Sequence, residues 1–174
     1  MSPRLRLCEI HNCLARHNAI IVHFSSNPNI SDFGLFFPDD LKGVITGNAM
    51  GGLCCSAVKP GDVFHGIKAH SFGSIGVIVD LQSAQSLRAV WVGDGGGQVI
   101  NGQRKFDEKR LDLQKLEDSL KRPTKTHNEW GVEHYIVRGL FVAPQIEVTV
   151  GPDEKQYLAP VSYTHLRAHE TGRN

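Results

Sequence analysis

Two short polar stretches lie where apolar, strand-like segments end or begin, and both hold residues that could do chemistry. Near the start, the motif HFS at residues 23–25 follows the apolar run from Ala19. Far along the chain, the motif NEW at residues 128–130 precedes the apolar segment YIVRGLFVAP. A carboxylate fixed at the mouth of a sheet can stabilise developing positive charge, and an imidazole can bind a hydroxyl group. The alternative is that His23 is a hydrogen-bonded core histidine and Glu129 a solvated charge at a strand entrance.

The order of these motifs resembles that of ADP-ribosyltransferases of the histidine-first type, a family that includes toxins that modify DNA. In that family an early strand carries His, an aromatic residue and then Thr or Ser, and a late strand begins at a catalytic Glu. The resemblance spans most of residues 20–150. It implies NAD as substrate, with Glu129 as the catalytic carboxylate and His23 and Ser25 as ligands of the sugar. It also implies that Phe24 or Phe72 stacks on the nicotinamide ring.

The chemistry of that family explains why such residues would be needed. Breaking the bond between nicotinamide and ribose develops oxocarbenium-like positive charge on the sugar, which a fixed carboxylate stabilises most strongly in the transition state. We therefore expect His23 and Glu129 to line one nucleotide-sized cavity. The family's middle strand carries Tyr or Ser, and both Ser56 and Ser74 are candidates. Because His127 stands where some relatives have Gln or Glu, the acceptor remains open among protein, nucleic acid and small molecule.

The neighbouring cysteines Cys54 and Cys55 suggest a second hypothesis. The segment CCSAVKPGDVFHG, followed by HSFGSIGVIVD, is similar to papain-like cell-wall amidases, in which a Cys–Ser pair opens a helix before a Pro-Gly-Asp turn. The resemblance implies a cysteine hydrolase whose thiol is activated by an imidazole. The chain departs from that family because no helix fits before Pro60, and because Ser74 stands where a histidine should start the next strand, with His70 nearby. The alternative is a pair of structural cysteines on a buried strand.

Two further motifs are better explained as ordinary structure. The segment CEIHNCLARH places Cys8, His11, Cys13 and His17 close together, and these are good zinc ligands. Their spacing is not a familiar paired-ligand pattern, so we expect no metal site. The segment GDGGGQ could cradle a phosphate only if a helix followed it, whereas the strand-like QVI follows. We therefore expect a hairpin turn there.

The pattern of elements predicts a single α+β domain over residues 1–160, with a mixed or mostly antiparallel sheet of about six strands and two helices. Connections are too short for regular βαβ units. One helix is expected to begin at a cap on Asp107 and to end before Pro123. The other helix is expected over residues 37–50, and strands are expected at 19–24, 52–58, 74–81, 86–92, 98–100, 133–142 and 145–150, with 86–92 and 98–100 forming a β-hairpin.

Charge and composition limit the classes of partner. The last 14 residues carry two arginines and one glutamate of the chain's 19 Lys+Arg and 18 Asp+Glu, so residues 1–160 hold 17 of each sign. A neutral domain has no strong general field for nucleic acid or acidic membranes. There is no apolar run of the roughly 20 residues that span a bilayer and no apolar signal core, so we expect a cytoplasmic protein with reduced thiols. A third hypothesis is a non-enzymatic partner-binding domain, in which Trp91 and Trp130 serve packing or an interface.

The segment VSYTHLRAHETGRN, residues 161–174, resembles a translated sequencing-library adapter of the transposase type. This resemblance implies that the sequence comes from an assembled environmental read and that the natural C-terminus is missing. We expect the segment to be disordered, because it has almost nothing to bury.

Overall fold

The computed structural model describes residues 5–25, 39–47, 52–62, 75–93, 98–100, 103–105, 111–143, 147–150 and 155–158. The adapter-like segment at residues 161–174 lies outside these ranges. These residues form three α-helices, namely α1 (Leu7–Arg16), α2 (Asp39–Ile45) and α3 (Leu113–Lys121). The strands are β1 (Ile20–Phe24), β2 (Leu53–Val58), β3 (Ile75–Leu81), β4 (Leu87–Trp91), β5 (Gln98–Ile100), β6 (Gln103–Lys105), β7 (Glu129–Val132), β8 (Tyr135–Val142), β9 (Glu147–Val150) and β10 (Lys155–Leu158).

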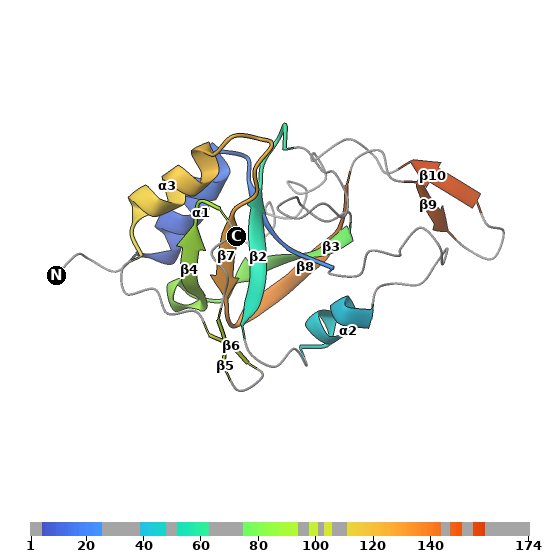
Figure 1. Ribbon diagram of the computed structural model, residues 1–174, viewed down its shortest axis with the longest axis horizontal. Coiled ribbons are helices and arrows are strands. Elements are labelled where there is room, and N and C mark those ends of the chain that lie inside the picture. Colours follow the sequence, from blue (N-terminus) through green and yellow to red (C-terminus); the bar gives the residue numbers. More distant parts are fainter. Residues whose placement is uncertain are drawn as a thin grey trace, which may run out of the picture.

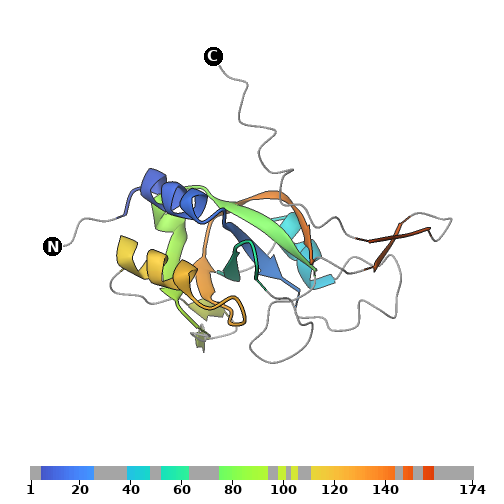
Figure 2. The same ribbon diagram turned by 90° about the horizontal axis from the view of Figure 1, so that it is seen from above.

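Six strands form one antiparallel sheet in the order β4-β7-β2-β1-β3-β8. This arrangement confirms the predicted α+β class and the antiparallel sheet. Two smaller ladders, β5–β6 and β9–β10, are separate from it, and the β9–β10 hairpin stands apart from the sheet in both ribbon views (Figures 1 and 2). In the sheet order, β1, β2 and β7 are consecutive neighbours, although β7 lies far from the other two in the sequence.

The pairing between β1 and β2 joins two halves of the sheet. Residues 20–22 of β1 pair antiparallel with residues 56–58 of β2. The next residues of β1, His23 and Phe24, pair with β3, and residues 53–55 of β2 pair with β7. The chain therefore places the predicted HFS motif at the end of the β1–β2 ladder, where each of these two strands pairs with its outer neighbour.

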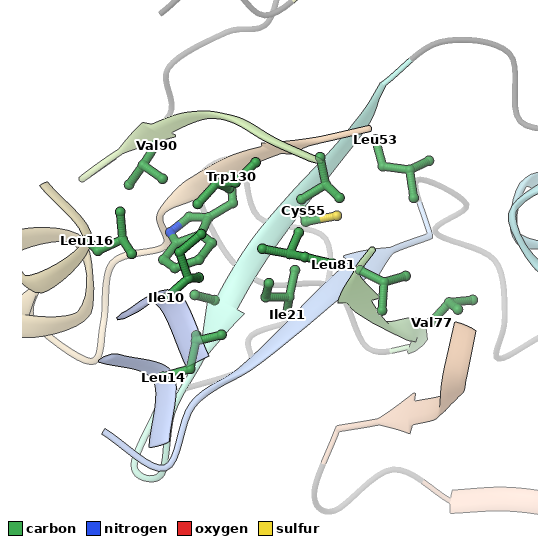
Figure 3. Packing of buried hydrophobic residues seen from close by; sticks show 14 of the residues in the cluster. Ile10, Leu14, Ile21, Leu53, Cys55, Val77, Leu81, Val90, Leu116 and Trp130 are labelled. Carbon is green, nitrogen blue, oxygen red and sulfur yellow. The ribbon is translucent and has the colours of Figure 1, made fainter. Parts of the chain in front are cut away.

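Apolar side chains from all three helices and from the sheet form the main core. Figure 3 shows Ile10 and Leu14 of α1 and Leu116 of α3 around the indole of Trp130. The Trp130 side chain is fully buried, and its Nε1 donates a hydrogen bond to the Ser119 hydroxyl at 2.9 Å. Burying such large apolar side chains is the dominant favourable term in folding. Trp130 therefore serves packing within the domain, as the third hypothesis allowed.

A second apolar cluster contains residues that alternate with those of the main core. It contains Val22, Val58, Phe141 and Ala143, with Phe24 packed against it. The rings of Phe24 and Phe141 meet edge to face, with centroids 5.4 Å apart and an interplanar angle of 88°. Because successive side chains of a strand point to opposite faces, the sheet is apolar on both sides.

Helix α1 is an element that the sequence analysis did not predict. It presents Ile10, Cys13 and Leu14 to the core, which is the spacing of one helical face. Its first turn is closed by Glu9, whose Oε2 accepts a hydrogen bond from the Arg6 backbone N–H at 2.8 Å. The segment has many polar residues, so its amphipathic pattern was obscured by the cysteine and histidine content that suggested a metal site.

One predicted strand pairing and two predicted boundaries were wrong. Segment 86–92 was expected to form a hairpin with 98–100, but β4 pairs with β7 and β5 pairs with β6. The strand expected at 133–142 begins only at Tyr135, as β8, and a separate strand, β7, precedes it. His134, whose φ is +53°, lies between β7 and β8. Helix α3 begins after Asp112, whose side chain accepts from the Lys115 N–H at 3.1 Å, whereas the expected cap Asp107 lies outside the described residues.

A polar cluster centred on Glu117 connects α1 with α3. His17 Nε2 lies 2.9 Å from Glu117 Oε2, and the Arg16 guanidinium and the Cys13 thiol both donate to Glu117 Oε1. Hydrogen bonds from His17 and Arg16 lower the pKa of Glu117 from 4.5 to about 2. Burial, with the neighbouring carboxylate, raises the pKa of Cys13 to about 11, so this thiol stays protonated at neutral pH.

The low pKa of Glu117 predicts an acid-dependent loss of stability. The contribution of Glu117 to folding is complete above its unfolded-state pKa of 4.5 and is lost as the pH falls toward about 2. Replacing Glu117 by Gln should therefore lower the free energy of unfolding clearly at pH 6 and hardly at all near pH 2. Urea unfolding of both proteins between these pH values measures the difference, and a difference that does not change with pH would contradict the prediction.

Candidate functional site

Glu129 is a buried carboxylate at the first position of β7, with an exposed fraction of 4%. On one side it pairs with Trp91 of β4, and on the other side the Cys54 thiol of β2 donates a hydrogen bond to its Oε1. Burying an ionised carboxylate is expensive unless polar groups stabilise it. A buried acid in the middle of a sheet is for this reason a candidate for chemistry. The structure shows that Glu129 is not the solvated charge that the alternative described.

His23 lies at the neighbouring position on β1 and is bonded to the same residue of β2. Its Nδ1 is 2.8 Å from the backbone carbonyl oxygen of Cys54. A carbonyl only accepts, so Nδ1 carries the proton in this bond. In the neutral ring this tautomer makes Nε2 an acceptor.

The strand register directs His23 and Glu129 to opposite faces of the sheet. His23 pairs with Val77 across β1 and β3, and Val77 belongs to the main core. Trp130 belongs to the same core, so Glu129, its neighbour on β7, points to the other face. The expectation that the His23 imidazole and the Glu129 carboxylate line one cavity is therefore wrong. The two are connected through Cys54, whose carbonyl bonds His23 and whose thiol bonds Glu129.

The other predicted ligands of the sugar and the base have protein partners. The Ser25 hydroxyl donates to the Asp40 carboxylate of α2 at 2.9 and 3.0 Å. Phe24 packs edge-on against Phe141 in the second apolar cluster. Phe72, the alternative aromatic residue, lies outside the described residues. Ser25 and Phe24 thus support the β1 end of the site from the protein side.

The middle strand contributes Cys54 and Ser56, which lie on the same side of β2 as Glu129. Ser56 is buried, and its hydroxyl donates to the Asn128 backbone carbonyl at 2.9 Å. Cys54 bonds Glu129, and the sequence analysis did not place these two residues together. The available signal was the two-residue spacing of Cys54 and Ser56, because side chains alternate along a strand and this spacing places both on one face of the sheet. The other candidate, Ser74, lies outside the described ranges.

The cysteine-hydrolase hypothesis requires an imidazole beside a reactive thiol, and the described contacts differ from that arrangement. Cys55 is buried in the main core, and burial raises its pKa well above the ordinary value. Cys54 donates its thiol proton to a carboxylate, while the His23 ring contacts its backbone carbonyl. The expected Pro60-Gly61-Asp62 turn is present, with Gly61 at φ +85°. His70 lies outside the described residues.

The residues of the suspected metal cluster are used in separate contacts. Cys13 and His17 both bond Glu117, and His11 Nε2 lies 3.0 Å from Asp80 Oδ1. Cys8 is an exposed free thiol. Within the part of the chain that the structure describes, no three His, Cys, Asp or Glu side chains are grouped so that they could hold a metal ion.

A buried ion pair holds the segment that leads into β7. Both terminal nitrogens of Arg122 donate to the Asp62 carboxylate, at 2.8 and 2.7 Å, and Nη2 also donates to the Ala57 carbonyl at 3.0 Å. The Lys59 ammonium donates to the Arg122 carbonyl at 2.9 Å. These bonds join the end of α3 to the end of β2. They therefore hold the segment before β7 against the end of β2, the two strands that meet at Glu129.

Comparisons of this chain with protein-family models, with curated proteins and with solved structures found no match. Among the described helices, none has both the length and the apolar character needed to cross a membrane.

Proposed function

We propose that this chain is an ADP-ribosyltransferase-like enzyme that uses NAD as substrate, with Glu129 as its catalytic carboxylate. The observation that carries the proposal is the position of Glu129. It is buried at the first residue of β7 and accepts a hydrogen bond from the thiol of Cys54 on β2. Strand β2 is the neighbour of the histidine-bearing strand β1. Early, middle and late motif strands of the resembled family would thus be neighbours in the sheet.

The proposed reaction exchanges one bond at the ribose. The bond between the ribose C1 and the nicotinamide nitrogen breaks, and its electron pair leaves with nicotinamide. The Glu129 carboxylate stabilises the oxocarbenium-like charge that develops on the sugar. A nucleophile of the acceptor, or water, then forms a bond to C1 and releases its proton to solvent or to a base. The proposed step is the same for a protein, a nucleic-acid or a small-molecule acceptor.

In the proposal, His23 supports this site through one ring nitrogen. Its Nδ1–H holds the carbonyl of Cys54, whose thiol orients Glu129. Because its ring faces the other side of the sheet from Glu129, His23 acts in the proposal through Cys54, and the sugar-ligand role that the family resemblance implies is not part of it. Ser25 and Phe24 position β1 through Asp40 and Phe141 rather than through the nucleotide.

Incubation of the purified chain with NAD labelled on the adenylate and, separately, on nicotinamide tests the proposal. We expect release of nicotinamide and saturable binding of NAD, with transfer of the adenylate label when a suitable acceptor is present. Calorimetric titration with NAD measures the binding independently of turnover. A chain that neither binds nor cleaves NAD would remove the proposed activity.

Substitutions of Cys54 separate a hydrogen-bond donor from a nucleophile. Cys54→Ser keeps a donor toward Glu129 and should retain most of the NAD cleavage rate, whereas Cys54→Ala should lower it by about tenfold. In the cysteine-hydrolase hypothesis both variants lose the nucleophile, and both would be inactive on an amide substrate. The steady-state rates of NAD cleavage by the two variants decide between these roles. A complete loss of NAD cleavage in both variants would exclude the role of Cys54 as a hydrogen-bond donor to Glu129.

A further inference from the structure

Asn128, the residue immediately before Glu129, has a fully buried side chain. Its amide bonds both backbone groups of Ala57 on the adjacent strand. The Ala57 N–H donates to Asn128 Oδ1 at 2.9 Å, and Asn128 Nδ2 donates to the Ala57 carbonyl at 3.3 Å. One side chain thus satisfies a donor and an acceptor of the same residue, as a paired strand residue would.

The positions of these two residues match the register of the β2–β7 ladder. Cys54 pairs with Gly131 and Cys55 with Trp130. Continued by two residues, this register places Ala57 opposite Asn128. The amide side chain therefore extends the ladder beyond the first residue of β7, at a point where the structure uses side-chain atoms in place of main-chain atoms.

Register decides which face Glu129 occupies. A slip of one residue in a strand moves every side chain to the other face of the sheet. Strand β7 is only four residues long, so few ladder bonds specify its register. Asn128 adds bonds at the end where Glu129 lies, and its main chain is held as well, because the Ser56 hydroxyl donates to its carbonyl at 2.9 Å.

The same side chain also bonds helix α3. Asn128 Nδ2 donates to the Ser119 backbone carbonyl at 3.1 Å. Amide hydrogen bonds of this kind are directional, and a buried amide that loses its partners destabilises the folded state. The Asn128 amide is therefore specified by its surroundings from both the strand and the helix.

We infer that Asn128 is a positioning residue, which sets the β2–β7 register that brings the Glu129 carboxylate to the Cys54 thiol. The inference rests on the proposed role of Glu129. It makes Asn128 act on the reaction only through Glu129, without contact to NAD.

The contact between Glu129 and Cys54 gives a readout that does not depend on NAD. A negative charge beside a thiol disfavours the reactive thiolate, so Glu129→Gln should raise the rate of Cys54 alkylation by iodoacetamide by about tenfold. Peptide mass spectrometry distinguishes Cys54 from the other three cysteines. If the inference is correct, Asn128→Ala should approach the rate of Glu129→Gln although its carboxylate is still present, and its kcat for NAD should fall with little change in KM.

The double variant separates positioning from simple loosening of the strand. When Asn128 acts through Glu129, adding Asn128→Ala to Glu129→Gln leaves the alkylation rate unchanged. When the substitution only opens the structure, the two effects multiply. Multiplying effects, or an Asn128→Ala protein that labels at the wild-type rate, would overturn the inference.

Ser119→Ala is the matched control, because it removes the hydroxyl that accepts from Trp130 Nε1 and, at 3.5 Å, from Asn128 Nδ2, and removes no atom of the two Ala57–Asn128 bonds. It should lower the melting temperature without changing the labelling of Cys54. If Asn128→Ala does not fold, Asn128→Asp keeps the acceptor for the Ala57 N–H and should label at an intermediate rate; labelling of Asn128→Asp at the wild-type rate would count against the inference. Absence of NAD turnover in the wild-type protein would count against the proposed function, whereas the labelling rates would still test the role of Asn128.

Discussion

Glu129→Gln should lower the rate of NAD cleavage by about 100-fold or more while the protein remains folded. The substitution keeps the size of the side chain and an oxygen that can accept the Cys54 thiol proton, but it removes the charge that would stabilise the oxocarbenium-like ribose. Because an uncharged amide is less expensive to bury than a carboxylate, the melting temperature should shift by no more than a few degrees. Single-turnover release of labelled nicotinamide and a thermal melt measure the two effects.

Glu133→Gln is the matched control for this prediction. Glu133 follows β7 directly, is half-exposed, and forms an ion pair with Arg88 at 3.4 Å. Neutralising it changes the net charge by the same amount at a distance of four residues from the site, and NAD cleavage should remain close to wild type. Equal rates for Glu129→Gln and the wild type would show that the buried carboxylate has no part in the reaction.

Local sequence patterns predicted five strands of the six-stranded sheet but missed β7, and they did not predict all of the strand partners. Runs of β-branched residues identified β1, β2 and β3 because such side chains fit a pleated, buried surface. The pairing of β4 with β7 joins segments that are about 40 residues apart, and nothing in the intervening sequence specifies it. A hairpin with the nearest strand-like segment was therefore the simpler prediction, and it was wrong.

The candidate site shows the same division between local and non-local information. Glu129 was predicted as a site residue from its place at a strand entrance, and the structure shows it buried at the first residue of β7. Its bond to Cys54 depends on the β2–β7 register, which only the folded sheet reveals. The opposite facing of His23 likewise follows from the pairing of β1 with β3. Residue types thus indicated the chemistry, whereas the direction of each side chain depended on strands that are distant in the sequence.

Arg122→Met should lower the free energy of unfolding by about 3–5 kcal/mol, the largest stability effect that we expect. The side chains of Arg122 and Asp62 are both 0% exposed in their ion pair, and the guanidinium bonds the carboxylate through two nitrogens. Removing the cation leaves the Asp62 charge buried without its main partner, and it also removes the donor to the Ala57 carbonyl. Urea unfolding at pH 7 measures the loss.

Arg138→Met provides the control for this prediction, because Arg138 also holds a carboxylate through two nitrogens, at 3.2 and 2.8 Å from Asp80 Oδ2, but is 54% exposed. Solvent already stabilises the charges of that pair, so its loss should cost about 1 kcal/mol or less. Adding Asp62→Leu to Arg122→Met removes the unpaired buried charge and should recover part of the stability. A loss of stability for Arg122→Met as small as that for Arg138→Met would show that the buried ion pair does not hold the segment that leads into β7. The position of Glu129 at the start of this strand would then depend on other contacts.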